Sequence, residues 1–342
     1  MSENSSSPSS HQEPEQPSDL RAAVAARGRR RRNGAIAAVV SLLAAAGIVA
    51  GVVAAVNGSG SSAEAAAGGS ADTGAAPAQR YSLNLAVAED TQFQDAIKEV
   101  AAEKGLDVTW TNVDDWVLPN TELVAGTVDG NAFQHVLYLS AFNRENGADI
   151  TPVFSTVIVQ WGIFSSTLDD VASIPDGGRI AIPDDPSNGG RALGILDAAG
   201  LITVDDAAGV FPTTEDITAN PKGLQFVEVP ARNIPQNFDD PSLSAVVVGT
   251  SYFDPSQGVT ADDALYLDDS LAQKNLPYVN VVATTADKAD DPAWEVLQEA
   301  YADPRVAEAL EAENFGTTVL VDVPVQQLRD TLADLEAQGA AA

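Results

Sequence analysis

From residue 80 onward, the chain alternates between short apolar runs that are typical of strands and longer segments with helical spacing. Residues 81–88 (YSLNLAVA) alternate apolar and polar positions, which predicts a strand. Phe93, Ile97 and Val100 then fall on one face of a predicted helix. Because this alternation continues along most of the chain, it predicts an α/β fold of parallel or mixed sheets flanked by helices.

The remaining segments extend the same pattern. Predicted strands cover residues 106–110, 153–164 (one long or two short strands), 179–182, 224–229, 243–249 and 279–284. Predicted helices cover a short stretch after Pro119-Asn120 and residues 133–143, 192–199, 292–301, 305–313 and 325–337. The string DDPSNGG at residues 184–190 predicts a loop. Two such α/β units would face each other across a cleft, with ligands at the carboxyl ends of the strands.

Residues 1–79 have a different pattern from the part that begins at residue 80, which we call the body. Residues 34–56 form an uncharged apolar stretch of 23 residues, long enough to cross a bilayer as one helix. The arginine cluster before it predicts a cytoplasmic N-terminus, so residues 1–33 are expected to be a disordered cytoplasmic arm. Residues 57–79 are predicted to be a flexible linker. The alternative is a cleaved signal and a secreted body, because small-residue sites such as Ala63-Glu64-Ala65 follow the stretch.

Composition restricts the chemistry that the body can perform. The chain has no cysteine, which excludes disulfides, thiolate metal sites, cysteine nucleophiles and a lipid-modified cysteine. His135 has no second histidine in the body, since His11 lies in the arm, so two-histidine zinc sites are excluded. The net charge of −31 opposes nucleic acids and anionic lipids and predicts a monomer. No cofactor or metal is expected.

Six strings, in order, carry a family resemblance. They are VAAEKGLDV (100–108), WVLPN (116–120), DGNAFQHVLYLSAFN (129–143), AIPDDPSNGGRALGIL (181–196), NPKGLQFVEV (220–229) and PYVNVV (277–282). Together they resemble the NlpA-type methionine-binding lipoproteins, the substrate-binding subunits of bacterial methionine ABC importers. The resemblance implies a two-lobed periplasmic-binding-protein fold of type II. It places residues 80–162 and 276–342 in lobe 1 and residues 163–275 in lobe 2, with the crossing strands as the hinge.

Arg191 and Asn188 are the first two candidate ligand residues. Arg191 is one of only 12 basic residues after residue 33, and a guanidinium can bind the carboxylate of a free amino acid with two hydrogen bonds. Its alternative role is a surface ion pair with the nearby aspartates. Asn188 could bind a polar group or form the turn. The resemblance favours ligand binding for both.

Phe133, His135, Tyr138 and Trp116 are candidate pocket residues. If residues 133–143 are helical, His135 and Tyr138 share a face, and their polar tips could reach a zwitterion. The alternative is a core aromatic plus a helix-capping histidine. Trp116 replaces the tyrosine that the family often has, and an aromatic face packs well on a thioether. The resemblance implies that Phe133, His135 and Tyr138 line the pocket.

Other positions depart from the family pattern. The family's asparagine after the strand AVI typically holds the amino-acid end of the ligand. Here Val248 could occupy its place, with Thr250 or Ser251 as a substitute, and Thr250 is taken as the candidate. Asn280, in the retained string PYVN, is assigned to the hinge or the pocket edge. Before the second lobe, Trp161 adds bulk that the family lacks.

The function predicted from these features is capture of methionine or a related amino acid outside the cytoplasm. The resemblance implies that the closed protein delivers its ligand to the permease and ATPase subunits of an ABC importer. A membrane-anchored sensor module with another small ligand is the alternative. An enzyme is not predicted, since the sequence lacks the strings GxSxG and GxGxxG and a Walker loop.

Overall fold

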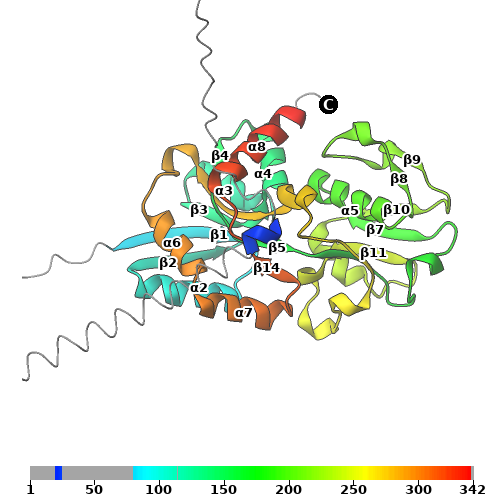
Figure 1. The fold of residues 1–342 in the computed structure, drawn as a ribbon, viewed down its shortest axis with the longest axis horizontal. Coiled ribbons are helices and arrows are strands. Elements are labelled where there is room, and N and C mark those ends of the chain that lie inside the picture. Colours follow the sequence, from blue (N-terminus) through cyan, green and yellow to red (C-terminus); the bar gives the residue numbers. More distant parts are fainter. Residues whose placement is uncertain (1–19, 25–79, 114, 340–342) are drawn as a thin grey trace, which may run out of the picture.

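Two five-stranded sheets organise the body, one toward each end of its long axis (Figure 1). The structure is a computed structural model that describes residues 20–24, 80–113 and 115–339. Each sheet with its helices is called a lobe below. From β1 onward the chain runs through the first lobe, crosses to the second after residue 155, and returns before residue 280.

The first sheet has the strand order β2-β1-β3-β13-β4. Its members are β1 (Tyr81–Val87), β2 (Leu106–Asn112), β3 (Gly130–His135), β4 (Ile150–Ser155) and β13 (Asn280–Thr285). β1 runs parallel to β2 and β3, whereas β13 is antiparallel to both of its neighbours. A late segment of the chain therefore lies inside a sheet that early segments begin.

The second sheet has the strand order β10-β7-β11-β6-β12. Its members are β6 (Trp161–Phe164), β7 (Arg179–Pro183), β10 (Gln225–Val229), β11 (Ala245–Gly249) and β12 (Ala264–Leu267). β7 is parallel to β10 and β11, and β6 is antiparallel to its neighbours. Both sheets are therefore mixed, as the sequence predicts for this α/β fold.

Two short strand pairs complete the topology. β5 (Val157–Val159) and β14 (Thr318–Leu320) pair antiparallel between the lobes. β8 (Thr203–Val204) and β9 (Ile217–Ala219) form a small ribbon in the second lobe. The β5–β14 pair joins the outgoing crossing of the chain to its C-terminal part.

In the part of the chain that the structure describes, seven longer helices cover the sheets. They are α2 (Gln92–Glu103), α3 (Leu118–Ala125), α4 (Val136–Asn146), α5 (Pro186–Ala198), α6 (Ala293–Tyr301), α7 (Pro304–Asn314) and α8 (Val325–Gly339). In Figure 1, α2 and α7 lie below the first sheet and α4 and α8 lie above it. Phe93, Ile97 and Val100 form the buried face of α2, which confirms the predicted periodicity.

The interior strand β13 supplies side chains to both faces of the first sheet. Val281 packs with Leu137 and Leu328 on the side of α4 and α8. Val282 packs with Ile97 and Trp294 on the opposite side. Successive residues of a strand point to opposite faces, so a strand buried on both sides must be apolar throughout. This explains the unbroken run VVA at positions 281–283.

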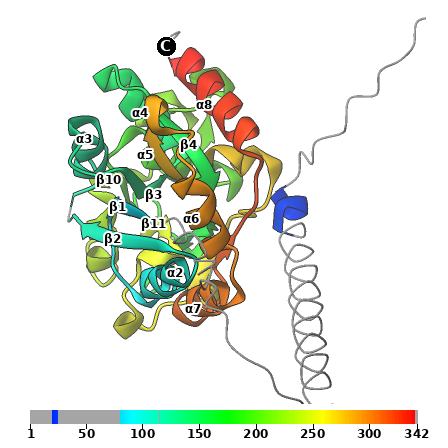
Figure 2. The same cartoon turned by 90° about the vertical axis from the view of Figure 1, so that its left-hand side faces the viewer.

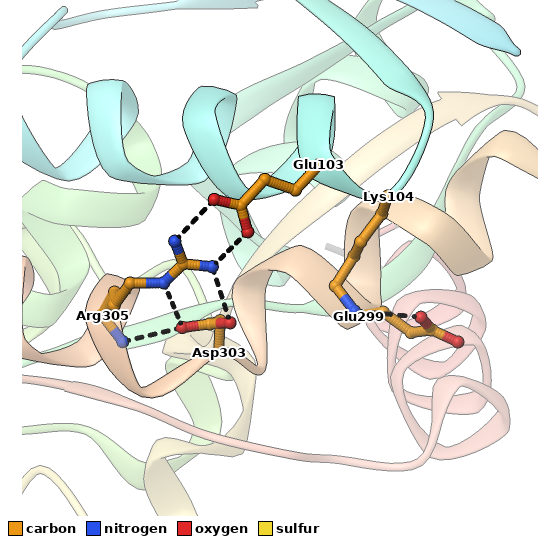
Figure 3. Close-up of polar contacts among 5 residues, drawn as sticks. All are labelled: Glu103, Lys104, Glu299, Asp303 and Arg305. Atoms are coloured by element: carbon orange, nitrogen blue, oxygen red, sulfur yellow. Dashed lines mark hydrogen bonds and ion pairs between the residues drawn. The ribbon is translucent and has the colours of Figure 1, made fainter. Parts of the chain in front are cut away.

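A surface cluster connects helices that are distant in sequence (Figure 3). The guanidinium of Arg305 donates to both carboxylate oxygens of Glu103, at 2.8 and 2.6 Å, and also to Asp303. Lys104 pairs with Glu299 at 3.3 Å. Exposed ion pairs stabilise by about 1 kcal/mol or less, so this cluster links α2 to α6 and α7 but adds little to stability.

Two predicted elements differ from the structure. Residues 184–190 are not a loop throughout, because α5 begins at Pro186 with Asp185 as its N-cap. Gly189 and Gly190 permit close packing: an added Cβ would lie 2.9 Å from Pro183 O and 2.9 Å from Pro212 Cδ, respectively. Residues 133–143 are not one helix, because β3 continues to His135 and α4 begins at the next residue.

The predicted membrane span, residues 34–56, lies outside the described residues, as does the linker 57–79. Among the residues that the structure describes, no helix has the length and apolarity needed to cross a membrane.

Part of the arm does fall within the described residues. Residues 20–24 form a short helix beside the body (Figure 2). They are ordered because Leu20 and Ala23 are buried against the first lobe and Arg21 pairs with Asp269.

Candidate ligand-binding site

A cavity of about 1110 Å³ lies between the two lobes. Its volume lies slightly above the usual range for small-molecule sites, about 300–1,000 Å³. All eight candidate residues from the sequence line this one cavity: Trp116, Phe133, His135, Tyr138 and Asn280 from the first lobe, and Asn188, Arg191 and Thr250 from the second. Their roles toward a ligand stay a prediction.

Arg191 lies in α5 and is 4% exposed. Its Nη2 donates to the backbone oxygen of Val159 at 2.9 Å and to Asp268 at 3.3 Å. The guanidinium lies between two rings, 4.3 Å from the centroid of Tyr278 and 4.7 Å from that of Trp161. Its Nε is buried and has no hydrogen-bond partner among the described residues. The guanidinium is therefore held rigidly while one of its donors stays free.

Asp268 is the counter-ion of Arg191. One carboxylate oxygen accepts from Arg191, and the other accepts from the backbone N–H of Trp161 at 2.9 Å. Burial raises the pKa of Asp268, and the positive charge of Arg191 acts in the opposite direction. Burial likewise lowers the pKa of Arg191, against the influence of Asp268. The pair lets a guanidinium exist in the protein interior before any ligand binds.

His135 is the N-cap of α4, so it does not share a helical face with Tyr138 as predicted. The capping histidine that the sequence left as the alternative is what the structure shows. Its Nδ1 accepts from the backbone N–H of Tyr138 at 3.0 Å, and its Nε2 lies 3.1 Å from Oδ1 of Asn188. These partners indicate the neutral tautomer with hydrogen on Nε2. Burial, and then the charge of Arg191, lower the pKa of His135 to about 4.

A chain of hydrogen bonds connects the lobes through His135. Asn188 accepts from His135 with Oδ1 and donates through Nδ2 to both carboxylate oxygens of Asp185, at 3.1 and 3.0 Å. A second contact places the guanidinium of Arg144, in α4, 5.5 Å from the ring centroid of Phe211 in the second lobe. The lobes are thus joined by direct contacts beside the cavity.

Aromatic side chains from both lobes provide the apolar wall. Trp116 and Tyr252 meet edge to face across the lobes at 5.4 Å, and Tyr252 meets Trp161 at 5.7 Å. Phe133 and Tyr138 meet at 5.9 Å. The hydroxyl of Tyr138 donates to the backbone oxygen of Trp116 at 3.2 Å, which holds the segment around Trp116 against α4. Such a wall suits an uncharged side chain better than a charged one.

Three buried side-chain amides, one of which lines the cavity, form hydrogen bonds with one another. Asn120 of α3 donates to Gln134 at 2.8 Å, and its oxygen accepts from Asn131 at 2.8 Å and from Gln134 at 2.6 Å. Gln134 also donates to Asn131 at 2.9 Å. Because Gln134 lies between Phe133 and His135 on β3, this network positions both neighbours. We call Asn120, Asn131 and Gln134 the amide network.

The end of β11 carries the residues considered as replacements for the family's asparagine. Val248 does not stand in the cavity: it is fully buried beside Phe164 and Ile234 in the core of the second lobe. Thr250 does line the cavity, although its hydroxyl already donates to the backbone oxygen of Gln160 at 3.0 Å. Between them, Gly249 offers no side chain at all.

The sequence alone assigns no role in the site to several further residues. Tyr252 and Trp161 line the cavity, and Asp268 and Tyr278 hold Arg191. Three of these residues follow or begin strands of the second sheet, at the edge where ligand sites are expected. Their position relative to the predicted strands is the sequence feature from which they could have been identified. Farther out, Glu89 and Arg232 line the cavity from opposite lobes; burial raises the pKa of Glu89, and Arg232 opposes this.

The low pKa of His135 predicts a pH-dependent stability. Because its folded pKa of about 4 lies below the ordinary 6.5, the unfolded chain binds the proton more readily between these values. The free energy of unfolding is therefore unaffected by His135 above pH 6.5 and falls as the pH decreases from 6.5 to 4. We expect the total decrease to be about 3 kcal/mol. Thermal unfolding measured at pH 7, 6, 5 and 4 would show it.

The matched control is His135→Asn, which retains a side chain suited to cap α4 but cannot titrate. Other groups also titrate over this range, and Asp268 and Glu89 have raised pKa values that act in the opposite direction. The informative quantity is therefore the difference between the wild type and the variant. Parallel curves for the two proteins would contradict the prediction.

Comparisons with known proteins identify the family. The family model for the NlpA lipoprotein matches residues 83–321. The chain belongs to the NlpA lipoprotein family. It is 34% identical over 228 residues to the D-methionine-binding lipoprotein MetQ of Salmonella typhimurium, covering 66% of this chain and 83% of that relative.

Solved structures of NlpA-like proteins share the fold. The crystal structure of the methionine-binding protein MetQ superposes with a TM-score of 0.66 and 32% identity, over 71% of this chain and 99% of that one. A nutrient-binding protein from Burkholderia cenocepacia, bound to methionine, gives a TM-score of 0.64 and 30% identity over 71% and 99% of the two chains. The two-lobed α/β architecture predicted from the sequence is confirmed.

Proposed function

We propose that this NlpA-family chain is the substrate-binding protein of an ABC importer and captures methionine or a related amino acid. One observation carries the proposal: Arg191 lines a cavity between two lobes, and the Nε donor of its buried guanidinium has no partner among the described residues. A carboxylate is the natural partner of such a donor. The names of the relatives, which include methionine-binding proteins and an ABC transporter substrate-binding protein, support the same ligand class.

The mechanism is capture without a chemical step. Arg191 binds the ligand's carboxylate, while Trp116, Phe133 and Tyr252 pack on its side chain; aromatic rings contact a thioether favourably. Methionine is uncharged along its side chain, so it matches the apolar wall. The hydrogen bond between His135 and Asn188 and the contact of Trp116 with Tyr252 form between the lobes and stabilise the closed state.

Isothermal titration calorimetry of the full chain tests this proposal. We expect one-to-one binding of methionine and much weaker binding of aspartate and lysine, whose charged side chains would face the aromatic wall. L- and D-methionine should both be titrated. A chain that binds no amino acid would contradict the proposal.

We further propose that residues 34–56 direct the body across the membrane and that a permease accepts the closed form there. The ion pair between Arg21 and Asp269 favours neither alternative, because an uncleaved span would place the arm and the body on opposite sides and cleavage would remove the arm. Mass spectrometry of the native N-terminus distinguishes an uncleaved anchor from a cleaved signal. Residues upstream of Ala63 still attached would indicate an anchor, and their loss would indicate a cleaved signal.

A further inference from the structure

Trp161 and Gly249 are directly opposite each other where β6 pairs with β11. Side chains at paired positions project from the same face of a sheet, so the indole lies over a residue that has no side chain. A Cβ at position 249 would lie 2.9 Å from Nε1 of Trp161 and 3.2 Å from Cγ1 of Val159. The indole therefore occupies the space that a side chain at position 249 would need.

The indole is held on its other sides as well. Its ring packs on the guanidinium of Arg191 at 4.7 Å and meets the ring of Tyr252 at 5.7 Å. The backbone N–H of Trp161 donates to Asp268, and the backbone N–H of Asp268 donates back to the oxygen of Trp161, both at 2.9 Å. Trp161 is 1% exposed, so its position is fixed by packing before a ligand arrives.

Where Arg191 packs on Trp161, two N–H donors have no hydrogen-bond partner among the described residues. Nε of Arg191 is buried and unpaired, and no hydrogen bond among the described residues uses Nε1 of Trp161, although this residue lines the cavity. A buried donor without a partner is unfavourable, so Nε of Arg191 lacks an acceptor unless a ligand supplies one. Nε1 of Trp161 offers a second N–H donor on the ring that packs against the same guanidinium.

We propose that Trp161 is a ligand-contacting, specificity-determining residue that binds the ligand's carboxylate together with Arg191. An indole N–H can only donate, so this pair of donors selects an anionic group with two acceptor oxygens. Gly249 is required because it leaves room for the indole. This inference rests on the proposed function, since it names the residues that bind one end of the same ligand.

Trp161→Phe in the full chain tests the inference by calorimetry with L-methionine as the probe. Phenylalanine keeps an aromatic ring against Arg191 but removes the N–H. We expect affinity to fall by about tenfold or more, the usual effect of losing a hydrogen bond to a charged group. The control is Trp294→Phe, whose indole donates to the backbone oxygen of Lys288; neither residue lines the cavity, so the change should alter affinity less than twofold.

Gly249→Ala provides a second, independent measurement. In the wild-type background the added methyl displaces the indole and should weaken L-methionine binding, whereas in the Trp161→Phe background it should add less than about twofold, since Nε1 is gone. Affinity of Trp161→Phe within twofold of the wild type would overturn the inference and leave the proposed function intact. Failure of the wild type to bind any amino acid would instead overturn the proposed function.

Discussion

Replacing Arg191 with alanine is expected to abolish most of the affinity for methionine. Loss of one partner of a buried charge pair usually costs about 2–4 kcal/mol of binding free energy, or roughly 30- to 1,000-fold in affinity. The same change leaves Asp268 buried without its cation and opens a gap between Trp161 and Tyr278. We therefore expect the free energy of unfolding to fall by about 3–5 kcal/mol as well. Calorimetry and urea unfolding measure the two effects.

Two further variants separate binding from stability. Arg191→Ala combined with Asp268→Asn removes the uncompensated charge, so it should recover part of the stability but none of the affinity. Arg179→Ala removes an exposed arginine of the same lobe, which donates only to Ser242 among the bonds described, and should change neither quantity. Unchanged methionine affinity in Arg191→Ala would refute the assignment of the carboxylate site.

Asn120→Ala is expected to give the second-largest loss, in this case of stability. The change leaves Asn131 Nδ2 and Gln134 Oε1 without a partner, both of them buried, whereas Gln134 Nε2 keeps its bond to Asn131. Each buried polar group left unpaired costs about 1–3 kcal/mol, so the free energy of unfolding should fall by at least about 2 kcal/mol. Because Gln134 lies between Phe133 and His135, methionine affinity should fall too. Urea unfolding and calorimetry measure both changes.

The control for the amide network is Asn237→Ala. Asn237 donates to the backbone oxygen of Asn233 at the surface of the second lobe, so its removal should cost less than about 1 kcal/mol. Equal effects of the two substitutions would show that the amide network does not stabilise the first lobe.

The sequence predicts where in the fold the site lies better than it predicts which side chains contact each other there. His135 ends β3, Arg191 follows β7 and Thr250 follows β11, so each lies at or just beyond the carboxyl end of a strand. Periodicity locates the strands, and topology brings their ends to one cleft. What periodicity does not contain is pairing across the fold. Asp268 is 77 residues from Arg191, and only the folded chain brings the two together.

Local signals with two meanings account for the other differences. Asn-Gly-Gly after Asp185 and Pro186 indicates a turn, yet the same glycines serve a helix that packs closely on Pro183 and Pro212. A histidine at the end of an apolar run fits either a helix face or a helix cap, and only the extent of β3 decides between them. Short strands such as β12 and β14 have too few residues for a clear alternation.

The position of β13 has a consequence for the order in which the lobes form during synthesis. The second sheet is built from one continuous stretch, residues 161–267, whereas β13 must enter between β3 and β4 to complete the first sheet. A chain that emerges from its N-terminus can therefore complete the second sheet first, while the early strands wait for residues 280–285. Until then β3 and β4 have exposed edges, and the amino-acid cavity acquires both of its walls only near the end of synthesis.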